Sequence, residues 1–218
     1  MTRKRVTKEE KQQRHEWAMK KIDQGVGFSE LASLVAETWG CSRRNARRVV
    51  SDAHKEWMDV AFGDDKLDYV LIKGAYLLGC RVSEIAVIRW QDIEALDEGG
   101  QIHLFGKGSK RRVVRVSSDT LALFEGLGRG ETEAYVFPSP RGKGHLTRQA
   151  IGDVCRKWGR AAGFHVHPHQ LRHSHATQAI RRGVDVFTLQ NTLGHSSSAT
   201  TGHYVASNPR DSSSLRLG

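Results

Sequence analysis

Two β-prone runs on either side of a glycine-containing turn constrain the fold of this chain more than any other sequence feature. The first run is Gln-Ile-His-Leu-Phe at 101–105, and the second is Arg-Arg-Val-Val-Arg-Val at 111–116. This arrangement predicts an antiparallel hairpin with a longer loop. Tyr135-Val-Phe predicts a third short strand before Pro138. Because helical patterns surround these runs, the expected fold is mainly α with a small antiparallel β-sheet, an α+β architecture.

Strongly apolar, helically periodic segments precede the hairpin. One helix is expected from Lys66 to Gly79, and a second begins near Ser83. Arg81 therefore lies in the short joint between two packed helices. The positions expected to face inward are Leu67, Val70, Leu71, Leu78, Ile85 and Ile88.

The chain before this region is helical and polar in pattern, and the glycine and charges at 63–66 predict a boundary. Within it, Gly40 suits the end of one helix and Ser42 the N-cap of the next, as in a helix-turn-helix. We expect a small helical module at 1–62 and a second domain at 63–218. Either the second helix contacts DNA through arginines on its outward side, or it is a basic solvated helix of a three-helix bundle. These arginines are Arg43, Arg44, Arg47 and Arg48.

The composition indicates a cytoplasmic protein with a polyanionic partner. The net charge of +10 favours nucleic acid, although charge alone does not exclude a generic basic surface. The sequence has no apolar run of the roughly 20 residues that a membrane helix needs, and the N-terminus lacks the apolar segment of a secretory signal. Three widely spaced cysteines predict neither a disulfide framework nor a zinc pair, which fits a reducing compartment: Cys41, Cys80 and Cys155.

The densest group of chemically active side chains lies on one predicted helix. Pro168 suits the first turn of a helix, which places His169 and Arg172 at i and i+3 on one face. Farther on come His195 and, nine positions later, Tyr204. With an arginine in a helix joint and a lysine on the hairpin, these side chains can stabilise a pentavalent phosphorane and move its protons.

Four stretches, in this order, resemble the tyrosine recombinases of the phage integrase family over roughly 64–206. The resemblance implies the catalytic domain of that family, preceded here by the helix-turn-helix-like module. It implies a site-specific recombinase or integrase of a mobile element or phage, which cuts and rejoins duplex DNA without metal, ATP or another cofactor. The stretches are Leu78-Gly-Cys-Arg81-Val-Ser-Glu84-Ile, Gly106-Lys107-Gly-Ser-Lys-Arg-Arg-Val, Pro168-His169-Gln-Leu-Arg172-His-Ser-His-Ala-Thr and Leu193-Gly-His195-Ser-Ser-Ser-Ala-Thr-Thr-Gly-His-Tyr204.

The resemblance also implies a role for each proton-transfer group. Tyr204 would attack a backbone phosphate and leave a 3′-phosphotyrosine and a free 5′-hydroxyl. A free tyrosine has a pKa of about 10, so it needs local help at neutral pH. His169 would accept its proton, and Lys107 would protonate the departing 5′-oxygen.

The remaining implied roles concern the charge on the phosphate. Arg81 and Arg172 would hold the non-bridging oxygens, and His195 would donate a hydrogen bond to the same phosphate. Glu84 would support the site by fixing its neighbours. Two arginines and a lysine would supply the positive charge that Mg²⁺ supplies in many nucleases, which predicts activity in the presence of a chelator.

Several alternatives remain open. His165-Val-His167-Pro-His169 with a tyrosine is typical of metal-dependent relaxase and replication-initiation nucleases, which form a 5′-phosphotyrosine, and the same histidines suggest a structural zinc site. A non-enzymatic DNA-binding regulator would use the N-terminal helices alone. Individual residues also have simpler interpretations: Arg81 as the ion-pair partner of Glu84, Lys110 in place of Lys107, and Tyr135 in place of Tyr204.

The sequence departs from the family pattern at both ends. Only some sixty residues precede the catalytic region, where many members have a longer DNA-clamping domain. The tail after Tyr204 is short and polar, and Asn208-Pro209 argues against a long helix there. We expect a monomer that assembles into a tetramer only on paired DNA sites, with a DNA-bending protein as a further candidate partner. The predicted location is the bacterial cytoplasm, where the protein would be associated with the nucleoid or be encoded by a phage or mobile element.

Overall fold

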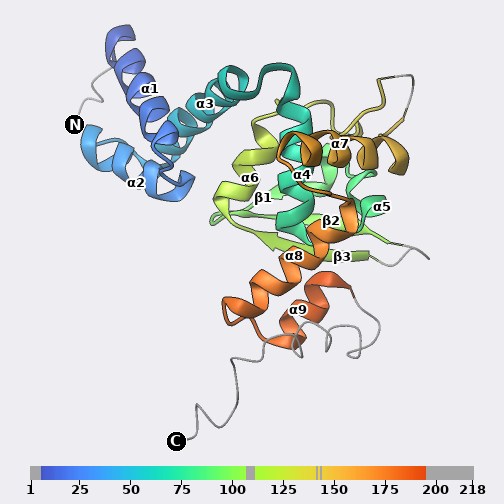
Figure 1. Ribbon diagram of the computed structural model, residues 1–218. Helices are drawn as coiled ribbons and strands as arrows, with labels where there is room; N and C mark the ends of the chain where they lie inside the picture. Colours follow the sequence, from blue (N-terminus) through green and yellow to red (C-terminus); the bar gives the residue numbers. More distant parts are fainter. Residues whose placement is uncertain (1–5, 107–110, 141, 143, 195–218) are drawn as a thin grey trace, which may run out of the picture.

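The computed structural model describes residues 6–106, 111–140, 142 and 144–194. Figure 1 shows a mainly helical protein built around one small sheet, with helices α1–α3 to one side. The N-terminal helices are α1 (Lys8–Asp23), α2 (Phe28–Trp39) and α3 (Arg43–Phe62), followed by a 3₁₀ turn at Gly63–Asp65. The remaining elements are α4 (Lys66–Leu78), α5 (Val82–Ile85), a 3₁₀ turn at Trp90–Asp92, β1 (Ile93–Ala95), β2 (Gly100–Phe105), β3 (Arg111–Val116), α6 (Ser118–Glu125), α7 (Arg148–Ala161), α8 (Pro168–Arg181) and α9 (Val186–Leu193).

The sheet contains the predicted hairpin. In the described residues it has three antiparallel strands in the order β1-β2-β3, with Ile102 of the central strand opposite Ile93 on one side and Val114 on the other. The third strand is β1, so the prediction that Tyr135–Phe137 forms it was wrong. Tyr135 makes only an isolated bridge with Arg89, because residues 134–136 pair with the loop before β1 and not with the sheet.

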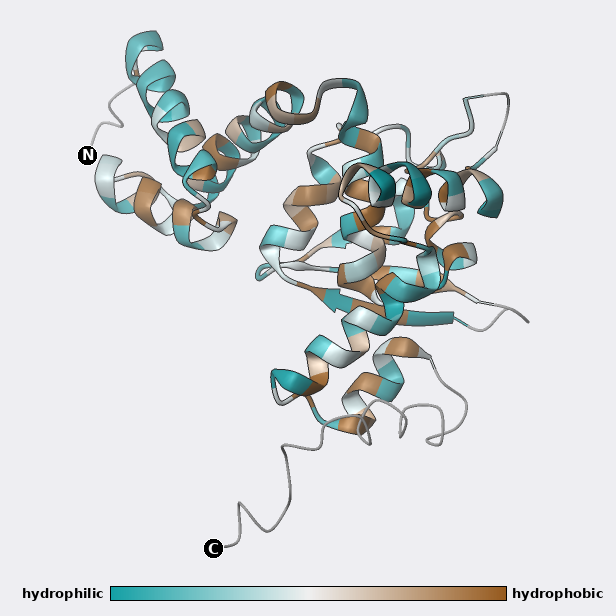
Figure 2. Ribbon diagram, viewed as in Figure 1, coloured by the Kyte–Doolittle hydropathy of each residue, from teal (hydrophilic) through white to brown (hydrophobic). Residues whose placement is uncertain are grey.

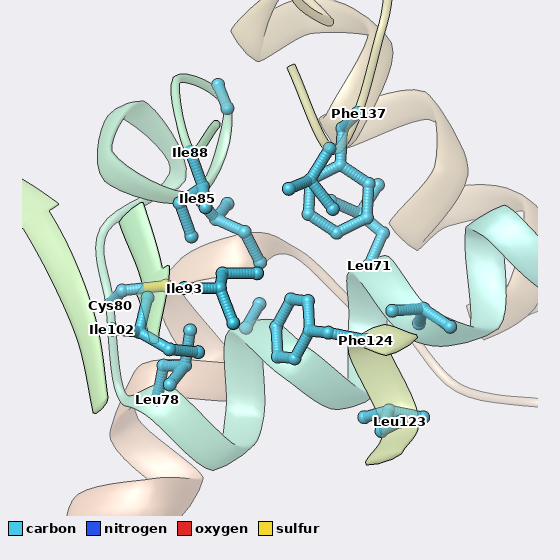
Figure 3. Close-up of a cluster of buried hydrophobic side chains, with 14 of the residues drawn as sticks. Leu71, Leu78, Cys80, Ile85, Ile88, Ile93, Ile102, Leu123, Phe124 and Phe137 are labelled. Atoms are coloured by element: carbon cyan, nitrogen blue, oxygen red, sulfur yellow. The ribbon is translucent and has the colours of Figure 1, made fainter. Parts of the chain in front are cut away.

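The main hydrophobic core lies between the sheet and the helices α4, α6 and α7. Figure 3 shows Leu71 and Leu78 of α4 packed with Phe124 of α6 and with sheet residues such as Ile102. The predicted inward positions of the first two helices are mostly confirmed, since Val70, Leu71, Leu78, Ile85 and Ile88 are buried and Leu67 is partly buried against the same core. Figure 2 shows that α4 and the strands carry many apolar residues.

The N-terminal helices have a second, smaller apolar cluster, centred on Leu31, Val35, Ala46 and Val50. Helix α3 contributes side chains to both the main hydrophobic core and the N-terminal cluster. Its first half packs on α1 and α2, whereas Trp57, Met58 and Phe62 near its end pack with the main core. The proposed boundary at 62–63 therefore coincides with the end of a helix, but the main core begins before it.

The local geometry of the predicted helix-turn-helix is confirmed. Gly40 ends α2 with a left-handed φ of 57°, and the Ser42 side chain accepts a hydrogen bond from the backbone N–H of Asn45 at the start of α3. The expected outward position of the arginines is wrong for Arg47. This side chain is half-buried, and its Nη1 donates to the backbone carbonyl of Asp97 at 2.6 Å, because the turn between β1 and β2 lies against α3.

Helices α8 and α9 extend away from the sheet beyond β3 (Figure 1). They share a small apolar cluster of Ala176, Leu189 and Leu193, partly covered by Ala179 and Ile180. Leu171 of α8 also packs against the main core, so it is α9 that has little apolar contact, and polar interactions become more important for fixing its end.

In the part of the chain that the structure describes, no helix has the length and apolar character required to cross a membrane. The cysteines are free thiols, with Cys80 and Cys155 buried and Cys41 half-buried. This agrees with the prediction that they form no disulfide framework.

Candidate active site

The candidate site is built where helices α4 and α9 end close together. Each ends at a glycine with left-handed backbone, Gly79 with φ of 56° and Gly194 with φ of 64°. A residue with a Cβ is disfavoured in this conformation, and at Gly79 a Cβ would also lie 2.9 Å from the Leu193 side chain of α9. The two glycines therefore let the two helix ends approach each other. The last carbonyls of both helices need hydrogen-bond donors at this point.

Arg172 of α8 supplies donors to both helix ends. Its Nη1 donates to the carbonyl of Gly79 at 2.7 Å, and its Nη2 donates to the carbonyl of Leu193 at 2.8 Å. The side chain is almost completely buried. Burial, followed by the charge of Arg81, lowers the pKa of Arg172 to about 10, so the guanidinium remains cationic at neutral pH. The negative ends of two helix dipoles compensate part of this buried charge.

Glu84 is the fully buried anion of the site. Its carboxylate accepts hydrogen bonds from the backbone N–H of Arg81 at 2.7 Å and from the Arg81 Nη1 at 3.0 Å. Burial by itself would raise the pKa of Glu84, but the hydrogen bonds from Arg112 and Arg81 outweigh it and lower the pKa below the ordinary value. Glu84 is thus ionised and fixes the N-terminus of α5.

Arg81 is a solvent-accessible cation among the described residues of the site. Its side chain is 44% exposed, although it is paired with Glu84. Its Nη2 also donates to the carbonyl of Gly194 at 3.3 Å. The ion pair with Glu84 that offered a simpler interpretation is present, and it leaves the guanidinium open to solvent. Pairing and phosphate binding are therefore compatible at this residue.

Arg112 of β3 is a member of this network that sequence reasoning missed. Its guanidinium donates two hydrogen bonds to the Glu84 carboxylate, and its Nε donates to the carbonyl of Thr192 at 2.9 Å. The alternation of the strand contained the signal. Residues 112, 114 and 116 share one face, and Val114 and Val116 on that face pack against the core, so an arginine among them points inward.

The three arginines converge on one short piece of backbone. Three consecutive carbonyls at the end of α9, those of Thr192, Leu193 and Gly194, accept from Arg112, Arg172 and Arg81 respectively. The predicted phosphate-binding pair is therefore gathered at one place, although Arg81 lies in a helix joint and Arg172 lies within α8, 91 residues later in the sequence. The next residue in the chain is His195.

Two further side chains near the joint have structural contacts. His175 of α8 lies half-buried beside Gly79, and its Nδ1 is hydrogen-bonded to the carbonyl of Tyr76 at 2.8 Å. Burial lowers the pKa of His175, which keeps this imidazole neutral at pH 7. Burial raises the pKa of the Cys80 thiol to about 12, so it is not a nucleophile under ordinary conditions.

The other predicted catalytic residues divide into two groups. His169 lies on the exposed first turn of α8, one turn before Arg172, and Pro168 opens that helix as expected. Lys107, His195 and Tyr204 lie outside the described residues, as does Lys110. Their assignment continues to rest on the sequence motifs.

The alternatives receive no support from the described residues. Within them, no group of three histidine, cysteine or acidic side chains is arranged to hold a metal ion, and this includes the cluster His165, His167 and His169. Tyr135 has a structural partner, since its hydroxyl accepts from Arg89 at 3.2 Å and its ring lies under the same guanidinium.

Comparison with known proteins identifies the family. Residues 47–211, well over half of the chain, match the phage integrase family. The chain belongs to this family, the tyrosine recombinases. A similar relative is the tyrosine recombinase XerD of Bifidobacterium longum (strain NCC 2705), 38% identical over 157 residues, which are 65% of this chain and 50% of that protein. The chain therefore spans about half the length of the curated relative it matches.

Solved tyrosine recombinases have the same fold. The crystal structure of the XerA recombinase superposes with a TM-score of 0.57 at 26% identity, covering 75% of this chain and 59% of that one. The Tn1549 transposon integrase in complex with circular intermediate DNA matches with a TM-score of 0.55 at 17% identity, covering 95% of this chain and 84% of the other. Because residues 1–62 make up more than a quarter of the chain, the second superposition includes most of the N-terminal helices, and it shows a shared fold alone.

Proposed function

We propose that this chain is a site-specific DNA recombinase that breaks and rejoins duplex DNA through a transient covalent bond to Tyr204. The observation that carries the proposal is the convergence of Arg81 and Arg172 on adjacent carbonyls at the end of α9. Family membership and the tyrosine motif that follows Gly194 support the same chemistry. The Tn1549 transposon integrase, which shares this fold, was solved in complex with circular intermediate DNA, and this favours DNA as the substrate here.

The division of labour between the arginines follows from their exposure. Arg81 is accessible and would donate to a non-bridging phosphate oxygen, whereas the buried Arg172 would add fixed positive charge from beneath. Neither side chain needs to reorganise greatly, because Glu84 and the helix-end carbonyls already hold both. Such preorganisation favours the pentavalent transition state, whose extra negative charge develops on those oxygens.

The proposed reaction has two transesterification steps. In the first, the Tyr204 oxygen bonds to phosphorus, the bond from phosphorus to the 5′-oxygen breaks, His169 takes the phenolic proton and Lys107 gives a proton to the leaving 5′-oxygen. In the second, a 5′-hydroxyl attacks the phosphotyrosine and releases Tyr204. The number of phosphodiester bonds is unchanged, so the cycle needs no ATP. The cationic side chains supply the charge stabilisation that Mg²⁺ supplies in many nucleases.

The wider organisation of the protein is also part of this proposal. The N-terminal module at 1–62 would contact DNA through the exposed Arg43, Arg44 and Arg48, with Arg47 holding the module to the sheet. The chain would be monomeric in solution and form a tetramer on paired sites, where a DNA-bending protein could assist. It would act on DNA in a bacterial cytoplasm, as the product of a phage, a mobile element or the host itself.

Covalent capture tests the proposal. The full chain is incubated with a pool of duplexes that carry a randomised central segment and scattered nicks, so that the short cleaved fragment diffuses away and resealing fails. We expect an adduct that survives denaturation, in which mass spectrometry finds the DNA 3′-phosphate on Tyr204, and which also forms in EDTA. The matched control, Y204F, should bind DNA and give no adduct. A 5′-linked adduct that requires a divalent metal would instead indicate a relaxase-type nuclease.

A further inference from the structure

Arg112 belongs to the second of the four motif stretches, but the resemblance gives it no role in the site. It reaches from strand β3 to two separate elements, the Glu84 carboxylate at the start of α5 and the Thr192 carbonyl at the end of α9. The side chain is 14% exposed, so it is largely withdrawn from solvent and from any DNA that approaches the surface. The hydrogen bonds that its guanidinium donates are thus made within the protein.

The packing around Gly194 points to the same connection. A Cβ at this position would lie 3.0 Å from the Arg112 Cδ and 3.2 Å from its Nη1. The backbone at the end of α9 therefore rests directly on the arginine, which fixes the position of the helix end sterically as well as through a hydrogen bond. Few apolar contacts reinforce it, because the cluster shared by α8 and α9 has only three buried members in the described residues.

We propose that Arg112 is a positioning residue for the recombination site and acts through the end of α9 on Arg81 and Arg172. It holds the Thr192 carbonyl in place, and the adjacent carbonyls of Leu193 and Gly194 in turn orient the guanidinium groups of Arg172 and Arg81. Through Glu84 it also fixes Arg81 from the other side. The inference rests on the proposed function and extends it to a residue that makes no contact with DNA.

The residue type matters because one side chain must donate hydrogen bonds to Glu84 and to the Thr192 carbonyl at the same time. A guanidinium donates in fixed directions to both carboxylate oxygens and to a carbonyl at once, whereas a lysine ammonium is a compact point charge on a shorter reach. R112K should therefore still neutralise Glu84 but release the end of α9. This separates positioning from simple charge compensation, which R112K would preserve.

The test compares R112K and R112Q with R115K, a control on the exposed face of the same strand. We expect R112K to keep its melting temperature and its affinity for captured duplexes, while the single-turnover rate of adduct formation at saturating DNA falls by about tenfold to a hundredfold. R112Q should lose both stability and rate, and R115K neither. Hydrogen–deuterium exchange of the DNA-free R112K chain should accelerate in residues 186–194 and not in α4.

Two results would overturn the inference, and a third would overturn the proposed function. A wild-type adduct rate in R112K would overturn the inference, and so would a rate loss accompanied by a matching loss of stability and faster exchange throughout the catalytic core. If the wild-type chain itself forms no adduct with any member of the pool, the proposed function fails. The exchange measurement then decides by itself whether Arg112 fixes the end of α9, since it requires no DNA.

Discussion

The N-terminal helices and the base of α9 are held in place by different physical means. Helices α1–α3 are held by apolar side chains such as Leu31 and Val50, which are fully buried and make non-directional contacts. The end of α9 is held by three arginines, a buried carboxylate and three backbone carbonyls, all in directional hydrogen bonds. Apolar packing stabilises a module, whereas the polar network fixes where particular atoms lie.

This contrast explains why buried charge, which is costly to desolvate, is kept at the base of α9, where Glu84 and Arg172 are buried together. An ion pair in a protein interior gains little over apolar packing of the same shape, and loss of one partner is strongly destabilising. Its advantage at the base of α9 is that guanidinium groups must remain cationic and correctly oriented for a phosphate. The N-terminal helices also bury one arginine, Arg14, but it pairs with Glu10 one turn away on the same helix.

The largest effect that would sharpen the comparison is expected for E84Q. The amide would face arginine donors with a donor of its own, so unfolding free energy should fall by about 4 kcal/mol. Since the folded-state pKa of Glu84 is lowered, its contribution is complete above its unfolded pKa, an ordinary 4.5, and disappears as the pH falls through the folded value.

Urea unfolding of E84Q and wild type between neutral and acid pH measures both quantities. The stability difference between the two chains should shrink below pH 4.5. The control is E98Q, which changes an exposed carboxylate in the turn between β1 and β2. An E84Q loss no larger than that of E98Q would show that the network contributes nothing to stability.

A somewhat smaller effect is expected for L31A in the N-terminal cluster. Removing this fully buried side chain should cost about 3 kcal/mol through lost apolar contact and the cavity left behind. The adduct rate per folded molecule at saturating DNA should remain unchanged, because no directional contact of the site is affected. The half-buried Leu34 supplies the milder control, L34A. A large rate loss in stably folded L31A would break the comparison between the two regions.

The smallest effects should come from G40A and G194A, a matched pair at helix ends. Both glycines have left-handed backbone, so each alanine should cost about 1 kcal/mol from the backbone alone. A Cβ at Gly40 meets nothing within 4 Å, whereas at Gly194 it meets Arg112. Thermal melting should therefore show an additional loss for G194A, accompanied by slower adduct formation. Equal stability losses in G40A and G194A would mean that the Arg112 side chain moves aside without a cost in free energy.

The parts of the fold that sequence reasoning found are those set by local chemistry. Gly40, Gly79 and Gly194 end helices because of their backbone freedom, and the two β-prone runs form the hairpin because alternation and a turn suffice. Arg81, Glu84 and Arg172 were found through motifs, and the structure brings them together at one helix joint.

What the sequence left hidden depends on tertiary contacts. Arg112 was placed in the β-prone run 111–116 but given no role, and only the alternation of that strand indicates that it points inward. One of its acceptors is the Thr192 carbonyl, a backbone group 80 residues away that no residue type marks in advance. Arg47 was assigned outward by helical periodicity, and its contact with Asp97 exists only because the sheet turn lies against α3.

Helix α3 enters both hydrophobic interiors, with a consequence for any attempt to divide the protein. Its 20 residues form a rod of about 30 Å, with Val50 inside one cluster and Met58 inside the other. A fragment starting at Asp64 would have an uncovered apolar surface where Met58 had been. The complementary fragment would end in the exposed apolar side chains of the last turns of α3. Both pieces would tend to aggregate. Dissection of this recombinase is therefore better attempted by point substitution than by cutting the gene.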